Sequence, residues 1–419
     1  MQGTVPAPLK CSVQIETLGK YCYTYDTGMY YYKDVCGVPP LGMIDDISGI
    51  AKCQENSVIL NTIINAKIES RKLEFNWKKC KNMHIGTNKQ NCQSLKVHGK
   101  DMMETDTQTY LGDTISSTGS NSENIKQRCK IGHSAISQIK SLMRDMSMGK
   151  FAIQIGLILR DSIFVSKMLL NSEVWHCLTV NQIIELEKID RILLRHILNA
   201  HSKTGIEWLY ADTGKLNLRS LIQIRRMMYL WHVLSRDESE LIRRVYDTQK
   251  VTNNTGDWYG MIAKDKQELG IHCLIQDVSK EWFKNFVKEK VKINFLQHLE
   301  NLKSKHSKST NLKCEDLKTA EYINSPRFSL IEKQLLFKLR SRTLDVKENF
   351  RNKDKDPWCI SCGLARETQS HLLECPEILK KLGYLADKNT KYEENFIYGN
   401  IEEQEIIIKV YGDILKIRD

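Results

Sequence analysis

The feature that most constrains the fold is a long central stretch in which apolar residues recur about every 3.6 positions, the period of an α-helix. The stretch runs from about residue 120 to about residue 350. Five segments carry the pattern most clearly: 122–143, 151–175, 180–198, 217–236 and 279–305. Polar breaks fall near residues 252–256 and 304–311, where Asn, Ser, Thr and Gly gather. We therefore expect this part of the chain to be almost entirely helical.

The first 118 residues differ from the central stretch, because short strand-like segments flank one amphipathic segment. Apolar residues at helical spacing predict a helix over about residues 55–71. Tyr-rich runs on both sides of residues 26–28 predict a hairpin. The expected fold class is thus α+β. We divide the chain into five expected domains, at residues 1–118, 119–250, 251–355, 356–378 and 379–419.

Composition narrows the setting in which the chain works. Lys and Arg outnumber Asp and Glu by 62 to 51, giving a net charge of +11, which is compatible with a polyanionic partner. The 13 Cys residues, an odd number in a long chain, are typical of a reducing compartment. No apolar run reaches the roughly 18 residues of a membrane span, and the N-terminus lacks a secretory signal pattern. We expect an intracellular protein, cytoplasmic and/or nuclear, with no membrane partner.

Four side chains of metal-binding type fall within a short segment near the C-terminus. Cys359-x2-Cys362-x8-His371-x3-Cys375 supplies three thiolates and one imidazole. Zinc prefers tetrahedral sulfur and nitrogen ligands, and a closed set of four suits a structural site, because a catalytic site keeps one position open. Gly363 suits the turn beneath the metal. A chance clustering of buried Cys residues is the alternative; we expect a structural Zn²⁺ held by these four residues.

Asp45 and Asp46 are adjacent carboxylates bracketed by apolar residues. The segments before and after them, 41–44 and 47–50, are typical of two short strands with the acids at the hairpin tip. A rigid tip suits catalysis by two Mg²⁺ ions, which are held by carboxylates about 3.5–4 Å apart. An ordinary acidic turn explains the pair without any metal. A two-metal site also needs a further carboxylate from another element.

The run Met43-Ile44-Asp45-Asp46, with the segments around it, resembles the reverse transcriptases of non-LTR (LINE-type) retrotransposons. "QGTVPAPL" looks like their Gln-Gly motif, "LEFNWKKCKNMHIG" like the next palm motif, and "TYLGDTIS" like the primer-grip hairpin. The helices that follow look like a thumb. "LLFKLRSRTLDVKENF" and the Cys/His run after it are similar to the C-terminal region of these enzymes. Each motif by itself is short, but their order along the chain is specific. The resemblance covers essentially the whole chain.

The resemblance implies a partial polymerase palm, a mainly helical thumb and C-terminal region, and a small zinc knuckle. It implies an RNA-directed DNA polymerase that copies element RNA by two-metal nucleotidyl transfer, with an RNA template, a DNA primer or target and deoxynucleoside triphosphates as partners. In this scheme Asp45 is a Mg²⁺ ligand, Asp46 supports it and Lys79 lies near the triphosphate. The matched motifs also imply nucleotide and template binding by Gln2 and Gly3, and a primer grip formed by Tyr110, Leu111 and Gly112.

Two departures from the family's pattern change this expectation. Met43 and Ile44 stand where an aromatic residue and Ala are usual. The family's first metal-binding Asp and its fingers lie upstream of the Gln-Gly motif, which begins at Gln2 here. We therefore expect the isolated chain to bind catalytic Mg²⁺ poorly and to be inactive on its own.

One helical segment places basic and aromatic residues side by side. Arg225 and Arg226 lie next to Tyr229, Trp231 and His232 in the sequence. Cations and rings on one helix suit contact with a nucleic-acid backbone and its bases. The alternative, which we favour, is that the aromatic residues are core and the arginines its solvated rim.

A second basic group, Arg340, Arg342 and Lys347, precedes the Cys/His run, so that a basic helix and the knuckle together are placed to bind one strand.

The leading interpretation of the whole sequence is the LINE-type RNA-directed DNA polymerase. The alternative is a non-catalytic zinc-knuckle protein that binds RNA or DNA. A decayed element copy with no selected role is a third.

Overall fold

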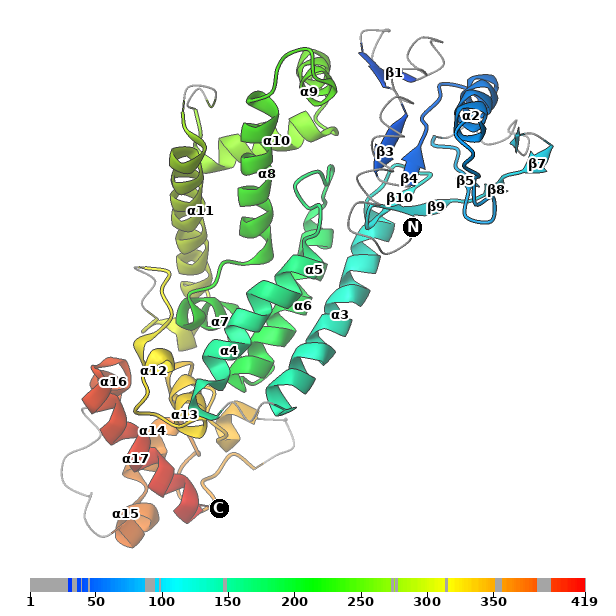
Figure 1. The fold of residues 1–419 in the computed structure, drawn as a ribbon. Helices are drawn as coiled ribbons and strands as arrows, with labels where there is room; N and C mark the ends of the chain where they lie inside the picture. Colours follow the sequence, from blue (N-terminus) through cyan, green and yellow to red (C-terminus); the bar gives the residue numbers. More distant parts are fainter. Residues whose placement is uncertain are drawn as a thin grey trace. The chain divides into compact units, whose positions relative to one another are not determined.

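The computed structural model describes residues 29–31, 36–38, 40–43, 46–86, 95–97, 99–145, 149–272, 275, 278–312, 316–350, 356–382 and 393–418. Gln2, Gly3, Asp45 and the hairpin expected at residues 26–28 lie outside these ranges. The described chain is mostly helical with a few small two-stranded sheets (Figure 1), in agreement with the expected α+β class.

The chain divides into two compact units. The first comprises Met1–Gln127, Asn171–Thr179 and Arg225–Asn285. The second comprises Arg128–Leu170, Val180–Ile224 and Phe286–Asp419. The domain boundaries expected from the sequence remain predictions.

All the described sheets lie in the first unit. Four are antiparallel: β1 (Met29–Tyr31) with β2 (Cys36–Val38), β3 (Leu41–Met43) with β4 (Asp46–Ser48), β6 (Lys96–Val97) with β7 (Lys100–Asp101), and β9 (Thr107–Tyr110) with β10 (Asp113–Ser116). One is parallel, β5 (Lys81–Asn82) with β8 (Met103–Glu104). These strands are too short to form a stable sheet alone, so packing must hold them.

Helix α2 (Gln54–Glu69) supplies that packing for β3 and β4. Its residues Leu60 and Ile64 are buried, and Ile47 of β4 packs against them, together with Ile63, Ile68 and Phe75. The helix expected at about 55–71 is thus confirmed. Glu55 and Glu69 of α2 are exposed, as expected for the polar side of an amphipathic helix.

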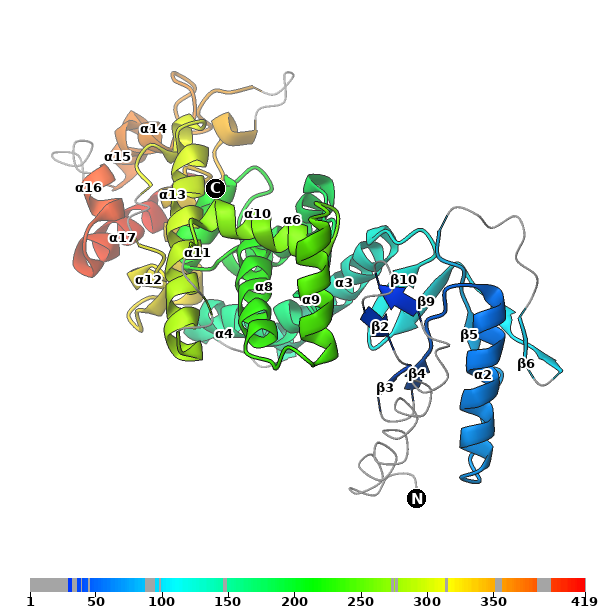
Figure 2. The ribbon, with the colours of Figure 1, turned by 90° about the horizontal axis from the view of Figure 1, so that it is seen from above.

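The first unit also contains the aromatic part of helix α8 (Leu218–Leu234), with α9 (Leu241–Thr252) and α10 (Trp258–Leu269) beside it (Figures 1 and 2). The ring of Trp258 contacts Tyr229 at 5.5 Å and Tyr246 at 6.1 Å between centroids. Such edge-to-face pairs are a favourable arrangement for buried rings. The polar break expected near 252–256 separates α9 from α10.

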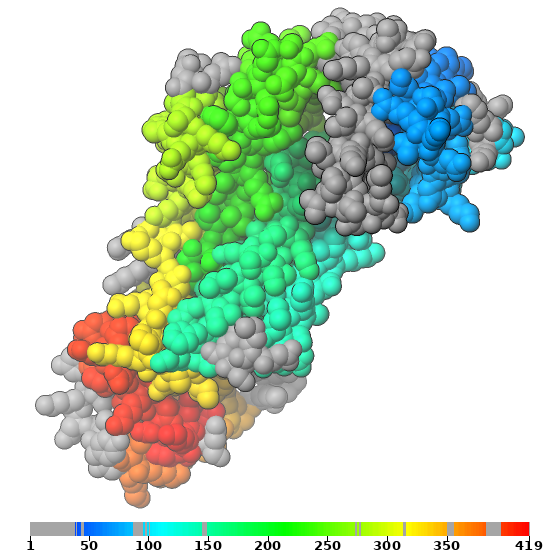
Figure 3. Space-filling view, in the orientation of Figure 1, coloured from blue at the N-terminus to red at the C-terminus, as the bar shows by residue number. Residues whose placement is uncertain are grey.

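The second unit consists mainly of helices. Its longer members are α4 (Ala152–Leu159), α6 (Val180–Leu198), α7 (Ile206–Thr213), α13 (Leu330–Arg340) and α17 (Ile401–Arg418). Shorter ones are α5 (Ser166–Met168), α12 (Glu321–Asn324), α14 (Gln369–Glu374), α15 (Pro376–Leu382) and α16 (Glu393–Tyr398). Helix α17, red in Figure 3, packs against α13, α15 and α16. Helices α3 (Ser122–Asp145) and α11 (Lys280–Lys303) match the segments expected at 122–143 and 279–305.

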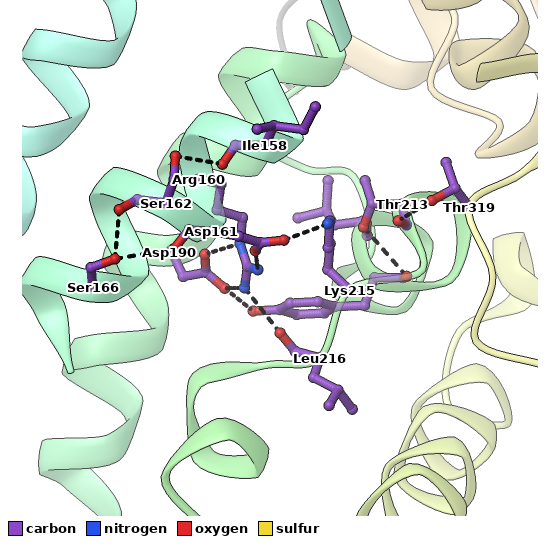
Figure 4. A network of polar contacts seen from close by, with 12 residues as sticks. Ile158, Arg160, Asp161, Ser162, Ser166, Asp190, Thr213, Lys215, Leu216 and Thr319 are labelled. Atoms are coloured by element: carbon purple, nitrogen blue, oxygen red, sulfur yellow. Dashed lines mark hydrogen bonds and ion pairs between the residues drawn. The ribbon is translucent and has the colours of Figure 1, made fainter. Parts of the chain in front are cut away.

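The helix expected at 151–175 is observed through Met168, but its winding changes from α to π at one turn. After α4 the backbone widens into a π-helical turn at Arg160–Val165, and α5 ends at Met168. Arg160 within this turn is buried and donates to both carboxylate oxygens of Asp190 on α6, at 2.7 and 2.8 Å (Figure 4). It also donates to the Leu216 carbonyl at 2.9 Å, and the Tyr210 hydroxyl donates to Asp190 at 3.0 Å. The periodicity of apolar residues continues through this turn, so the sequence pattern did not reveal the π-helical winding.

Candidate metal centre

Residues 357–375 form a short hairpin followed by one helical turn and a half, which we call the metal hairpin. Trp358 and Arg366 face each other in an antiparallel bridge. The Cys359 amide donates to the Ala365 carbonyl at 2.8 Å, and the Glu367 amide donates to the Pro357 carbonyl at 2.9 Å. Because neighbouring residues of a strand point to opposite faces, Trp358 lies outward while Cys359 points in.

Two backbone features set the ligand positions. Gly363 has φ +65°, a left-handed conformation that favours glycine, and its amide donates to the Cys359 carbonyl at 2.9 Å. Thr368 caps helix α14 by accepting a hydrogen bond from the His371 amide at 3.0 Å. The helix then carries His371 and ends at Cys375, so both ligands lie on one side of it.

The four candidate ligand atoms converge on one point. The three thiol sulfurs and one imidazole nitrogen all lie within 4.8 Å of one another. Cys359 Sγ is 3.8 Å from Cys375 Sγ, and Cys362 Sγ is 3.4 Å from His371 Nε2. Cys359 and Cys375 are buried, while Cys362 and His371 are partly exposed. The cluster expected from the spacing is therefore present, and it can hold a metal ion.

The electrostatics of the cluster favour a cation between the thiols. Amide hydrogens of Leu364 and Ala365, with His371, lower the pKa of the Cys362 thiol to about 6. Burial, together with the neighbouring thiols, raises the pKa of Cys375 to about 11. The Cys362 thiol thus loses its proton easily, whereas the nearby Cys375 thiol keeps its proton. A divalent ion bound here would favour the ionised form of all three thiols, because its charge stabilises each thiolate.

Glu367 anchors the metal hairpin to the rest of its unit, a role that sequence reasoning missed. Its side chain is almost fully buried and accepts hydrogen bonds from the amides of Lys347 and Ile360, each at 3.1 Å. Arg418 at the end of α17 lies 3.6 Å from the same carboxylate. An acidic residue between two metal ligands was the one available signal for this role.

The basic residues expected to bind nucleic acid include two that lie in buried ion pairs. Arg340 donates to both oxygens of Asp212, at 3.0 and 3.1 Å, and its guanidinium lies 5.5 Å from the ring of Tyr322. Arg226 donates to Asp265 at 3.1 Å and to the Trp175 carbonyl at 2.8 Å. Both guanidinium groups donate to acceptors within the protein, so their role in this structure is to stabilise the fold.

The other three basic residues lie nearer the surface. Burial lowers the pKa of Arg225, and the nearby Glu173 opposes that shift. Arg342 is half-buried and has φ +52°. Lys347 Nζ lies 3.4 Å from Asp356. Arg342 and Lys347 both belong to the second unit, which also contains the metal hairpin.

Three segments in which the sequence led us to expect polymerase motifs are described in part. Asp46 is exposed and pairs across the hairpin with Met43. Leu111 and Gly112 both have positive φ, so β9 and β10 are joined by the two-residue type I′ turn that matches strand twist. Burial raises the pKa of the Tyr110 phenol, and the charge of Asp46 raises it further. Asp46 and the β9–β10 hairpin are therefore near each other, whereas Lys79 lies in an exposed turn before β5.

No protein-family model and no curated protein matches this sequence. Across the described ranges, no helix is long and apolar enough to cross a membrane.

Proposed function

We propose that this chain belongs to the RNA-directed DNA polymerase of a LINE-type retrotransposon. The observation that carries the proposal is the order of the motifs, from the paired acids to the Cys/His run. The surroundings of Asp46 add support, because the β3–β4 hairpin, helix α2 and the β9–β10 hairpin follow one another as palm segments would, and Asp46 lies close enough to act on Tyr110.

In the proposed reaction, Asp45 and Asp46 would help to hold Mg²⁺, which would supply activation of the primer 3′-hydroxyl and charge stabilisation of the leaving pyrophosphate. Asp45 would bind one ion at the hairpin tip and Asp46 would support it. Lys79 would neutralise charge on the triphosphate, and Tyr110, Leu111 and Gly112 would hold the primer end. Exposure of Asp46 is compatible with this role, because a ligand for an incoming metal–nucleotide complex must be reachable.

We propose that the metal of the Cys/His cluster is zinc. Thiolates about 2.3 Å from a tetrahedral zinc ion lie about 3.8 Å apart, and a thiolate and an imidazole lie about 3.6 Å apart. The distances of 3.8 Å and 3.4 Å in the cluster agree with both values. All four positions come from protein side chains, so the ion would stabilise structure rather than bind substrate.

The test begins with the transcript, sequenced upstream into this reading frame. The proposal predicts a continuing frame that encodes an Asp in an apolar strand, and primer extension on RNA by that longer protein. The Asp46→Asn variant should lose extension while the Lys52→Gln variant, an exposed neighbour outside the motif, keeps it. Absence of both the upstream Asp and extension would overturn the polymerase proposal.

A second candidate function is nucleic-acid binding without catalysis, in which the zinc-stabilised region binds RNA or DNA. The closed, four-ligand cluster favours it, because such sites serve structure and recognition. Zinc-dependent binding that weakens steeply with salt, with no nucleotide incorporation, would select this candidate.

A further inference from the structure

Five basic side chains from separate segments of the second unit act on shared neighbours through their charges. We call them the basic cluster: Arg195, Lys203, Lys308, Lys338 and Arg342. Arg195 comes from the last turn of α6, Lys203 from the loop after it, Lys308 from the 3₁₀ turn Ser307–Ser309, and the last two from the end of α13. Of these five, only Arg342 is among the nucleic-acid-binding residues expected from the sequence.

Hydrogen bonds hold these segments together. Lys308 Nζ donates to the Arg342 carbonyl at 3.4 Å. Arg195 Nη2 donates to the Thr204 carbonyl at 3.2 Å, and the hydroxyls of Thr204 and Thr343 lie 3.4 Å apart. The loop at residues 203–204 is therefore fixed against the end of α13, which brings distant cations together.

The positive charges of the basic cluster act on one another. Burial lowers the pKa of Lys308, and the charges of Lys203 and Arg342 lower it further, against an opposing effect of Glu348. Burial also lowers the pKa of His201, where Lys203, Lys338 and Arg195 outnumber the opposing Asp345. The Asp345 carboxylate is itself 2.6 Å from Lys338. An anion at this surface would relieve the repulsion.

Helix-end electrostatics explain only part of the basic cluster. Cations near the C-terminal ends of α6 and α13 complement the helix dipoles, which accounts for Arg195 and Lys338. Lys203 and Lys308 belong to neither helix. Arg342 occupies a left-handed position just after α13, where glycine is the usual residue.

The basic cluster borders the exposed face of the metal hairpin. Lys308 donates to the side chain of Asn349, and the neighbouring Glu348 carboxylate lies 4.0 Å from Arg366. Arg366 is paired across the hairpin with Trp358, whose side chain is 47% exposed. An exposed indole beside a guanidinium suits stacking on an unpaired base.

We infer that the basic cluster binds the phosphodiester backbone of a single nucleic-acid strand and that Trp358 stacks on one of its bases. This inference rests on the proposed nucleic-acid function and names the surface that performs it. Lys203 and Lys308 are exposed and Arg195 is half-buried, so the cations lie at different depths, which suits a narrow strand better than a flat lipid surface. The zinc-stabilised hairpin would then hold Trp358 in place for the base.

The test measures binding of the zinc-loaded full chain to a fluorescent single-stranded RNA and to the matching DNA, over a series of salt concentrations. The Lys203→Gln/Lys308→Gln variant should bind at least tenfold more weakly. The slope of log affinity against log salt concentration should become shallower by about 1.4, because each of the two lost phosphate contacts on a single strand accounts for about 0.7. The Trp358→Ala variant should lose about tenfold in affinity at an unchanged slope, because stacking releases no counterions. The matched control is Lys288→Gln/Lys409→Gln, which removes two exposed lysines from α11 and α17.

The outcomes separate this inference from the function it rests on. If the Lys203/Lys308 variant binds like its control while the unaltered chain binds well, the basic cluster is not the surface. If the unaltered chain binds neither RNA nor DNA at low salt, the nucleic-acid function itself fails. Binding to vesicles containing phosphatidylserine through the same lysines, without strand binding, would assign the surface to lipid. Arg342→Gly, which suits the left-handed backbone, tests the cluster in a variant expected to fold and should also weaken binding.

Discussion

The β3–β4 hairpin and the metal hairpin are similar in size but are stabilised in opposite ways. The β3–β4 hairpin depends on a small apolar core around Leu60 and Ile64, and its Asp46 lies exposed at the tip. The metal hairpin places four ligands around one point and buries Glu367 beneath them. A short hairpin is marginal in water without such support. The metal hairpin therefore carries its four candidate metal ligands within its own residues, whereas the β3–β4 hairpin depends on apolar residues supplied by other elements.

The largest effect is expected from removing a metal ligand. Cys375→Ser should release the zinc and unfold the metal hairpin, because structural zinc sites contribute about 10–16 kcal/mol of binding free energy in zinc-finger peptides. Metal content per chain and hydrogen exchange over residues 357–375 measure this. Cys53→Ser is the control, since Cys53 is exposed at the start of α2 and should leave zinc binding intact. A Cys375→Ser chain that keeps one zinc and full protection would refute the metal assignment.

The next effect concerns the β3–β4 hairpin. Leu60→Ala should destabilise it by about 2–5 kcal/mol, because the side chain is buried and the cavity cannot fully close. Hydrogen exchange of the β4 and α2 amides reports the loss locally. Ile59→Ala, in which the neighbouring side chain is 47% exposed, should cost less than about 0.5 kcal/mol. Equal effects of the two substitutions would mean that apolar packing does not hold this hairpin.

A smaller effect is expected at the anchor of the metal hairpin. Glu367→Gln leaves an acceptor oxygen for only one of the two amides of Lys347 and Ile360, because the NH2 group that replaces the other oxygen cannot accept. It also removes the charge partner of Arg418, and the expected cost is about 1–3 kcal/mol. The zinc should remain bound but exchange faster with a competing chelator. Glu374→Gln on the exposed side of α14 is the control. Unchanged chelator kinetics would show that the anchor does not support the metal site.

The smallest effect tests whether Asp46 acts on its neighbour. Asp46→Asn should lower the pKa of Tyr110, because the negative charge that disfavours the phenolate is gone while burial remains. Carbon-13 NMR of labelled tyrosine across the alkaline range follows this phenol directly. Asp101→Asn, an exposed acid of β7, should leave Tyr110 unaltered. The same pKa in both variants would separate Asp46 from the β9–β10 hairpin.

Features set by short-range patterns could be predicted from the sequence. The apolar periodicity of residues 180–198 gave a helix at the observed position, because core-facing residues recur at the helical period. The spacing of Cys359, Cys362, His371 and Cys375 gave the cluster, since all four lie within one hairpin and one helical turn.

Features that depend on long-range pairing could not be predicted. Arg340 was expected to contact nucleic acid, because its partner Asp212 lies far away in the sequence and the pairing could not be foreseen. The basic cluster was invisible for the same reason, since Lys203 and Lys308 come together only through the fold of the second unit. The π-helical turn at Arg160–Val165 changes the winding of the helix without interrupting the apolar pattern.

The buried contact between Arg160 and Asp190 has a consequence for how the bundle assembles. Smooth apolar faces permit neighbouring helices to slide by a turn at little cost, whereas a bidentate ion pair is satisfied at one offset only. Breaking such a pair leaves an uncompensated charge at a cost of about 3–5 kcal/mol. We expect this contact to fix the position of the π-helical turn along α6, so that its main contribution is to disfavour misaligned packings of the bundle.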